Sequence, residues 1–436
     1  MASKVDDCSR DLSLHKAVFT GQIETLEELL KKINEKDVNR QDIHGNTALI
    51  IAVMKGNHRC VELLLKSGAL TTVRNELNWM SVHEAISYGH IPTIKLLNDA
   101  VSHRILRFLK RDNLFKLVDS IKEDFELSFD FQIKDYNPEA ITGPPEFKYL
   151  VNKKGLRIRV DVQTTDTFHT KHEEFHLIFD LSQTSDTFVI IMVGENIPVY
   201  QRVTYDDWNG VINQIFSGVT ADEEIRSLLQ KENTCAKLDI TTQMTTQQTK
   251  VPIFKKLVTK KVGKYTTNVF ESLAIELITK TRTEHMINRE NSTTNVIESL
   301  APPPPLARHI SWEEYINSSK GQWPHFGRQK IEKSEAKRVS IVVGLTDEIS
   351  FQWKWIVKEA EQLLSQQLIA FITRLIDDLP KGFPVFIDYP LKQNVYMKWK
   401  LKSFDLKSDF DESLFEIPPN FEQRVIFRVE RNGEHN

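Results

Sequence analysis

Apolar residues recur at two different spacings along the chain. In roughly the first hundred residues they follow the helical spacing of three and four, as in Leu26, Leu29 and Leu30, and again in Val61, Leu64 and Leu65. From Phe125 onward the spacing changes to two. Alternation of this kind is typical of half-buried strands, and it predicts a mostly antiparallel sheet. The alternating segments are 125–131, 156–162 and 175–179, followed by a continuous apolar run at 188–193.

The helical part contains an internal repeat. Ala17, Ala52 and Ala85 are 35 and 33 residues apart, and each is followed four residues later by a glycine and twelve residues later by a leucine. This period is typical of ankyrin repeats, in which each unit is a β-turn and two helices. The small alanines let paired helices approach closely, and the glycines permit a left-handed backbone where a helix ends. The sequence therefore predicts about three ankyrin repeats in residues 1–105.

An ankyrin array offers a concave surface to partners and rarely supplies catalysis. Trp79 and Met80 fall at the predicted tip of the third unit. They are candidate anchors for a partner segment, because aromatic residues and methionine are enriched in interface cores. The other interpretation is that they pack against the domain that follows. This interpretation is favoured because an array of only three repeats needs a cap.

Composition narrows the class of protein further. Lys and Arg number 57 against 60 Asp and Glu, a net charge of -3, which argues against a nucleic-acid-binding chain. The three cysteines form no C-x-x-C pair, so we expect neither a disulfide framework nor a cysteine zinc site. The first ten residues lack a secretory apolar core, and no apolar run approaches the ~20 residues of a membrane helix. We therefore expect a reducing compartment, with any membrane contact made through a partner, a surface or a modification.

One catalytic motif requires consideration. His172-Glu173-Glu174-Phe175-His176 matches the H-E-x-x-H of zinc proteases, which needs a helix to bring both histidines to one face. Here the motif continues into a segment that alternates like a strand. We therefore expect a structural or surface role for these histidines, and a zinc hydrolase is kept as an alternative. The sequence has no P-loop, dinucleotide fingerprint or nucleophile elbow, so no catalytic residue, cofactor or metal is expected.

The rest of the chain divides at a linker. Residues 281–310 are rich in Asn, Ser and Thr and include four consecutive prolines at 302–305. Beyond it, Ser311 is placed to cap a short helix that starts at Trp312. A long amphipathic helix is predicted over 353–378, followed by strands over 383–389 and 394–401. We expect 106–280 and 311–436 to be two parts of one β-rich α+β domain.

Ten short blocks in a shared order resemble one family. The combination is similar to the ankyrin-repeat GPCR-chaperone family, the ankyrin repeat domain-containing protein 13 proteins. The tail lacks the acidic run with Ala and Ser of a ubiquitin-interacting motif, so the chain resembles the branch without such motifs. The blocks are 14–16, 45–49, 84–89, 155–161, 200–202, 310–315, 324–328, 379–385, 387–390 and 415–418.

This resemblance implies a fold and a function. The fold class is a multidomain α+β protein with N-terminal ankyrin repeats and a β-rich chaperone-like domain. The implied function is a non-enzymatic chaperone, cytoplasmic and peripheral on the cytosolic face of the endoplasmic reticulum. It would bind cytosolic segments of newly made G-protein-coupled receptors, or of other membrane proteins, and control their export. The family has no assigned catalytic residues.

Two further expectations concern binding. Tyr88, Trp312 and Tyr315 lie inside the resembling blocks and join Trp79 and Met80 as candidate partner-binding residues. We also hypothesise that a sheet edge accepts an extended client segment, because backbone hydrogen bonds read little sequence. The alternative from another class is a soluble ankyrin scaffold with no role at a membrane.

Overall fold

The structure is a computed structural model of the chain. It describes residues 11–109, 111–136, 146–165, 172–193, 198–205, 207, 221–240, 254–272, 275–286, 310–324, 326, 330–351, 353–354, 379–392, 394–407 and 409–426. The helix predicted over 353–378 lies almost entirely outside these residues, as does most of the segment 281–310.

Paired helices form the N-terminal part, and each pair corresponds to one predicted repeat. The helices are α1 (Ser13–Thr20), α2 (Ile23–Leu30), α3 (Glu35–Val38), α4 (Ala48–Met54), α5 (His58–Lys66), α6 (Ser81–Tyr88) and α7 (Ile91–Leu109). Ala17, Ala52 and Ala85 are all buried at the contacts of α1, α4 and α6. Gly21 and Gly89 end their helices with φ of 71° and 66°, the left-handed geometry that the repeat predicted. Thr47 caps α4 by accepting from the Ile50 amide.

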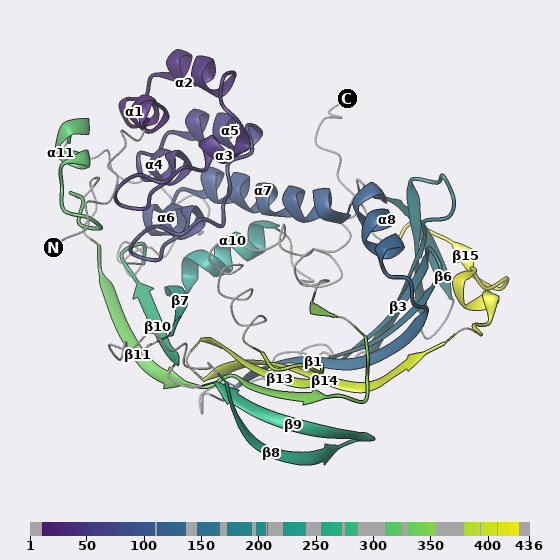
Figure 1. The fold of residues 1–436 in the computed structure, drawn as a ribbon. Coiled ribbons are helices and arrows are strands. Elements are labelled where there is room, and N and C mark those ends of the chain that lie inside the picture. The colour runs from purple at the N-terminus through teal and green to yellow at the C-terminus, as the bar shows by residue number, and fades with distance from the viewer. Residues whose placement is uncertain are drawn as a thin grey trace.

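A large antiparallel sheet forms most of the remainder. Its twelve strands run in the order β15-β6-β5-β4-β3-β2-β1-β14-β13-β12-β9-β8. Figure 1 shows the sheet as a curved layer, with the ankyrin helices standing over one end and α7 crossing toward α8 (Arg111–Ser120). The strands are β1 (Phe125–Asp135), β2 (Glu146–Lys154), β3 (Arg157–Thr165), β4 (His172–Asp180), β5 (Thr187–Val193), β6 (Val199–Thr204), β8 (Phe254–Val262), β9 (Tyr265–Ser272), β12 (Val342–Thr346), β13 (Phe383–Lys392), β14 (Val395–Leu406) and β15 (Glu422–Gln423).

Strands from both sides of the proline-rich segment share this sheet. β1 pairs with β14 from Phe125↔Leu406 to Asp135↔Val395, and β9 pairs with β12. Apolar residues of these strands, such as Phe125, Leu401 and Phe404, form one cluster, and a register shift between Ser128 and Phe129 accounts for the odd spacing on β14. The α+β class, with ankyrin repeats before a strand-rich region, is confirmed. The exact domain boundaries stay a prediction.

A second, three-stranded sheet lies between the ankyrin helices and the large sheet. Its order is β11-β10-β7, with β7 (Asn233–Ile240), β10 (Ile275–Arg282) and β11 (Glu332–Val339). β10 therefore continues two residues into 281–310, and β7 packs against α6. Helix α10 (Ala221–Gln230) contacts α7, and α11 (Trp312–Ile316) lies beside α1. These elements place residues from distant parts of the chain against the ankyrin turns.

Candidate functional site

The turn of the second ankyrin repeat holds a side chain from α11. Asp42 Oδ1 accepts from the amides of His44 and Asn46 at 2.8 and 2.9 Å, which fixes the turn. The Tyr315 hydroxyl donates to Asp42 Oδ2 and accepts from Asn46 Nδ2 at 2.8 Å, and Tyr315 is fully buried. Burial and the neighbouring Asp42 carboxylate both raise the pKa of the Tyr315 phenol, so it stays protonated and able to donate.

His44 completes this contact. The Gly321 amide donates to His44 Nδ1 at 3.1 Å, so the ring proton belongs on Nε2. Nε2 then donates to the Tyr315 carbonyl at 3.0 Å. Residues 311–323 therefore occupy the turn of the second repeat from within the same chain.

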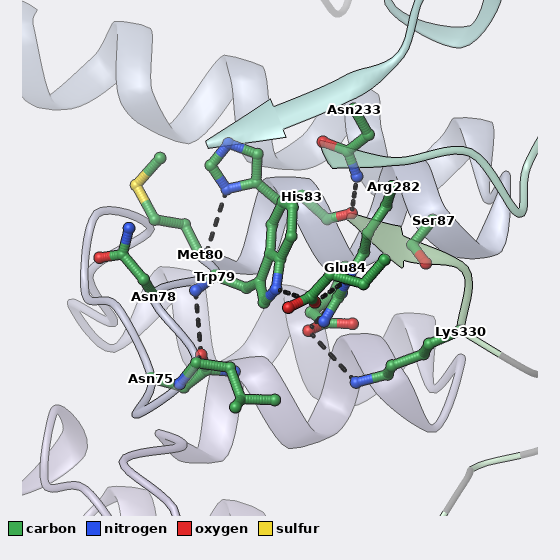
Figure 2. A network of polar contacts seen from close by, with 12 residues as sticks. Asn75, Asn78, Trp79, Met80, His83, Glu84, Ser87, Asn233, Arg282 and Lys330 are labelled. Carbon is green, nitrogen blue, oxygen red and sulfur yellow. Dashed lines mark hydrogen bonds and ion pairs between the residues drawn. The ribbon is translucent and has the colours of Figure 1, made fainter. Parts of the chain in front are cut away.

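The turn of the third repeat is closed by a buried charge cluster. Figure 2 shows Trp79 beside the guanidinium of Arg282, which lies 4.0 Å from the centre of the indole ring. Trp79 Nε1 donates to Glu332 Oε2 at 2.9 Å, and Arg282 donates to Glu84 Oε1 at 3.0 Å and to Glu332 Oε2 at 3.2 Å. Lys330 Nζ lies 3.8 Å from Glu84 Oε1. The side chains of Glu84 and Arg282 are both fully buried.

The charges in this cluster compensate one another. Burial alone would raise the pKa of Glu84, but the cations Lys330 and Arg282 outweigh it and the pKa falls below the ordinary value. Burial likewise lowers the pKa of Lys330, against the attraction of Glu84. The neighbouring His83 is held neutral, because burial lowers its pKa to about 3. The cluster is therefore an internal joint between the repeats and strands β10 and β11.

The five predicted partner-binding residues all make contacts within the chain. Trp79 and Tyr315 have no exposed surface, and Tyr88 is 7% exposed in the ankyrin core. Trp312 is half-buried, with its ring 5.5 Å from that of Phe19. Met80 is half-buried at the start of α6. The contacts of Trp79 agree with the interpretation that it packs against the following domain. Binding of a partner by these five residues stays a prediction.

A groove of about 490 Å³ remains open beside these internal contacts. We call it the finger groove. Three consecutive residues of β7 and three of β13 line the groove. Successive side chains of a strand point to opposite faces, so a groove that contacts three in a row lies along the edge of the strand. One wall is the ankyrin turns and the other is the strands. Its lining residues are Gln41, Arg74, Asn75, Glu76, Asn78, Ala236, Lys237, Leu238, Leu277, Tyr389, Pro390 and Leu391.

Both strand edges at the finger groove are unpaired within the described residues. β7 is the outer strand of its sheet, and the pairing of β13 with β12 ends at Asp388. Burial raises the pKa of Tyr389 to about 12, so its hydroxyl stays protonated there. Lys237, half-exposed, and Leu391, 38% exposed, are accessible from solvent. The groove therefore offers backbone groups, a cation and apolar surface together.

The H-E-x-x-H segment lies in strand β4, not in a helix. Two residues four apart in a strand are separated by about 13 Å, since each residue rises about 3.3 Å. The segment therefore lacks the helix that brings both histidines of this motif to one face beside a zinc ion. His176 Nδ1 instead lies 2.7 Å from Asp161 Oδ1. In the part of the chain that the structure describes, no cluster of His, Cys, Asp or Glu could hold a metal ion.

Sequence reasoning missed the residues that organise these contacts. Asp42 and Asn75 are 33 residues apart, one repeat length, and Asn75 Oδ1 accepts from the amides of Leu77 and Trp79 as Asp42 does in its own turn. That period could have identified them. Arg282 and Glu332 carried no such signal, because they belong to no repeat and lie about 200 residues or more from Trp79 in sequence.

Comparison with known proteins follows the same division of the chain. The family description "Ankyrin repeats (3 copies)" matches residues 14–105. Ankyrin repeat domain-containing protein 13C from Homo sapiens is 26% identical over 95% of this chain and 78% of its own length. The Danio rerio protein of the same name is 25% identical over 94% of this chain and 85% of its own length. Ankyrin repeat domain-containing protein 13B from Homo sapiens is 23% identical over 87% of this chain and 65% of its own length.

The structure and the comparisons each support one conclusion about the chain. None of the helices in the described segments is long and apolar enough to cross a membrane. The resemblance predicted from the sequence blocks is confirmed: the chain is an ankyrin-repeat protein related, over nearly its whole length, to the ankyrin repeat domain-containing protein 13 family.

Proposed function

We propose that the chain is a non-enzymatic chaperone that holds an extended segment of a client protein in the finger groove. The client class is implied by the family resemblance: cytosolic segments of newly made G-protein-coupled receptors or of other membrane proteins. The same resemblance implies action at the cytosolic face of the endoplasmic reticulum, where binding would control biogenesis and export. The ankyrin repeats support a protein as the partner.

The occupation of the ankyrin turns supports this location. Partners of ankyrin arrays commonly need the turns and the concave face. Here Tyr315 fills the second turn and the Arg282 cluster closes the third. The part of the turn surface around Arg74 and Glu76 remains open, and it lies in the finger groove.

The unpaired edges of β7 and β13 are the observation that carries the proposal. An extended peptide can add its backbone hydrogen bonds to such an edge, while pockets beside it take alternate side chains. A volume of about 490 Å³ is in the range of ligand sites that hold part of an extended segment. Backbone hydrogen bonds at a strand edge depend little on the sequence of the bound peptide, which suits a chaperone that binds several clients.

Variants in the groove test the proposal. Lys237→Glu and Leu391→Asp change exposed side chains of the groove without touching the Arg282 cluster. Lys66→Glu, on the exposed outer side of α5, is the matched control. Each protein would be co-purified from cells that synthesise a tagged receptor, after circular dichroism confirms its fold. We expect both groove variants to recover about tenfold less receptor and the control to recover the wild-type amount. Equal recovery by all three variants would contradict a client site in the groove.

Proximity labelling separates the chaperone from a soluble scaffold. With the label on the N-terminus, a chaperone at the endoplasmic reticulum enriches polytopic membrane proteins of that organelle. A neighbour set made only of soluble cytosolic proteins would favour the scaffold and refute the membrane-protein client.

A further inference from the structure

The hairpin of β8 and β9 carries a concentrated positive charge. Residues 254–272 include five lysines and a single carboxylate, Glu271, in a chain whose net charge is -3. Four of the lysines form two pairs on β8, Lys255-Lys256 and Lys260-Lys261, and all four side chains are exposed. The fifth, Lys264, follows in the turn.

Of the five lysines, only Lys264 forms an ion pair within the described residues, and Glu271 lies opposite Lys255 in the ladder. Lys264 Nζ pairs with Asp405 at 2.9 Å, and Glu348 lies near enough to Lys261 to interact with its charge. None of the ion pairs in the described part of the chain includes Lys255, Lys256 or Lys260. Lys260 instead lies 5.5 Å from the centre of the Phe386 ring. Because successive side chains of a strand point to opposite faces, each lysine pair places one cation on either face of β8, and the four lysines flank its open edge from both sides.

Apolar surface lies between the two lysine pairs. Leu257 is 51% exposed and Val258 is 49% exposed. Lysines that flank exposed aliphatic side chains suit the boundary between lipid headgroups and acyl chains, where cations meet phosphates and apolar groups enter the layer.

The position of the hairpin makes it accessible. β8 is the last strand of the twelve-stranded sheet, and Figure 1 shows the hairpin projecting on the side away from the ankyrin helices. None of the residues of the hairpin lines the finger groove, so the two surfaces use different side chains.

A break in the strand register favours a membrane over an added peptide strand. The pairing of β8 with β9 shifts between Lys256 and Val258 and leaves Leu257 outside the ladder. Bulges and lysines on an edge strand both oppose the addition of another strand. The same features do not hinder contact with a charged surface, because that contact requires no backbone register.

We propose that the β8–β9 hairpin is an electrostatic docking surface for membranes that contain anionic phospholipid. The open edge of β8 faces the membrane; Lys255, Lys256, Lys260 and Lys261 reach headgroup phosphates or carboxylates from the two faces of the strand, and Leu257 and Val258 enter the boundary layer. The inference is independent of the client site, because it uses another part of the fold and a different ligand.

Vesicle sedimentation tests this directly. The full chain would be mixed with vesicles of phosphatidylcholine, or of phosphatidylcholine with about one quarter phosphatidylserine. We expect sedimentation with the anionic vesicles only, and loss of binding as the salt concentration rises. Absence of binding to the anionic vesicles, or equal binding to both kinds, would overturn the proposal.

Charge-matched variants locate the surface. The hairpin variant replaces Lys255, Lys256, Lys260 and Lys261 by glutamine. The control variant makes the same net change on exposed ankyrin residues, Lys31, Lys32, Lys36 and Lys66. Since each lysine near an anionic surface contributes about a fivefold change in affinity, we expect the hairpin variant to bind about a hundredfold or more weakly. The control should stay within about twofold. Equal losses by both variants would show a general effect of net charge and refute the hairpin as the site.

The apolar contribution has its own variant. Leu257→Ala should weaken binding to the anionic vesicles by about tenfold, because aliphatic surface is lost from the boundary layer. Unchanged binding by this variant would refute insertion of Leu257. The Lys237→Glu groove variant should bind vesicles as the wild type does, so failure of the client site and failure of the hairpin are distinguishable.

Discussion

Removal of the Arg282 guanidinium should separate the ankyrin repeats from the strands that pack against them. Arg282→Met keeps an unbranched apolar chain beside Trp79 but removes the charge. Among the described residues, Glu84 then loses the one hydrogen bond that its carboxylate accepts, since its Oε2 has no partner and Lys330 is 3.8 Å from Oε1. Breaking a buried ion pair by removing one partner costs about 3–5 kcal/mol, and because the Lys330 charge remains near Glu84 we expect a loss at the lower end of that range. That is a large share of the roughly 5–15 kcal/mol by which domains are stable.

A double-mutant cycle isolates the interaction. Glu84→Gln, Arg282→Met and the double variant would be unfolded in urea and followed by tryptophan fluorescence. Because both side chains belong to one cluster, the double variant should be more stable than the sum of the single losses predicts, by up to about 3 kcal/mol. Arg59→Met is the control, since Arg59 pairs with Glu62 and Glu27 on a half-exposed surface, where ion pairs contribute about 1 kcal/mol or less. Strictly additive losses, or a loss from Arg282→Met no larger than that of the control, would refute the reasoning.

Three further outcomes follow from other contacts. Tyr315→Phe should lower the free energy of unfolding by about 1.5–3 kcal/mol in the same urea assay, because the buried Asp42 and Asn46 lose a partner; no loss would contradict this. The pKa of His83 is about 3 when folded and 6.5 when unfolded, so only the unfolded chain binds this proton as the pH falls below 6.5. The free energy of unfolding should therefore decrease by about 2 kcal/mol toward pH 5, and by less in His83→Gln. Identical pH profiles for the two proteins would refute a neutral, buried His83 in the folded chain. Gly344→Ala should lower the free energy of unfolding by about 1–3 kcal/mol, since a Cβ atom there would lie 2.2 Å from Phe386 Cε1. A melting temperature equal to that of the wild type would contradict this overpacking.

Much of the fold could be predicted because it depends on local periodicity. The alanine and glycine spacing identified the repeats, since each repeat buries the same small residue and ends its helix in the same left-handed turn. The alternation at Phe125 and Phe175 identified β1 and β4 for a similar reason. What periodicity could not predict is the pairing of β1 with β14, whose residues are more than 250 positions apart.

The candidate site was less predictable for a physical reason. Trp79 could be named as a candidate because it is an aromatic residue at a predicted turn. The residues that contact it, Arg282 and Glu332, come from strands that are distant in sequence. The finger groove depends on where one edge of β7 and one edge of β13 have no strand partner within the described residues, which is a property of tertiary structure. A polar sequence such as Lys237-Leu238-Asp239 gives no local sign of an unpaired edge.

Site-specific photo-crosslinking tests most directly where a client binds. A photoreactive amino acid would replace Lys237 in the finger groove or Lys66 on the outer ankyrin surface, in cells that synthesise a tagged receptor. The proposed client site predicts crosslinks to a cytosolic segment of the receptor from position 237, with few from position 66. Crosslinks from position 66 alone would contradict the finger groove as the client site.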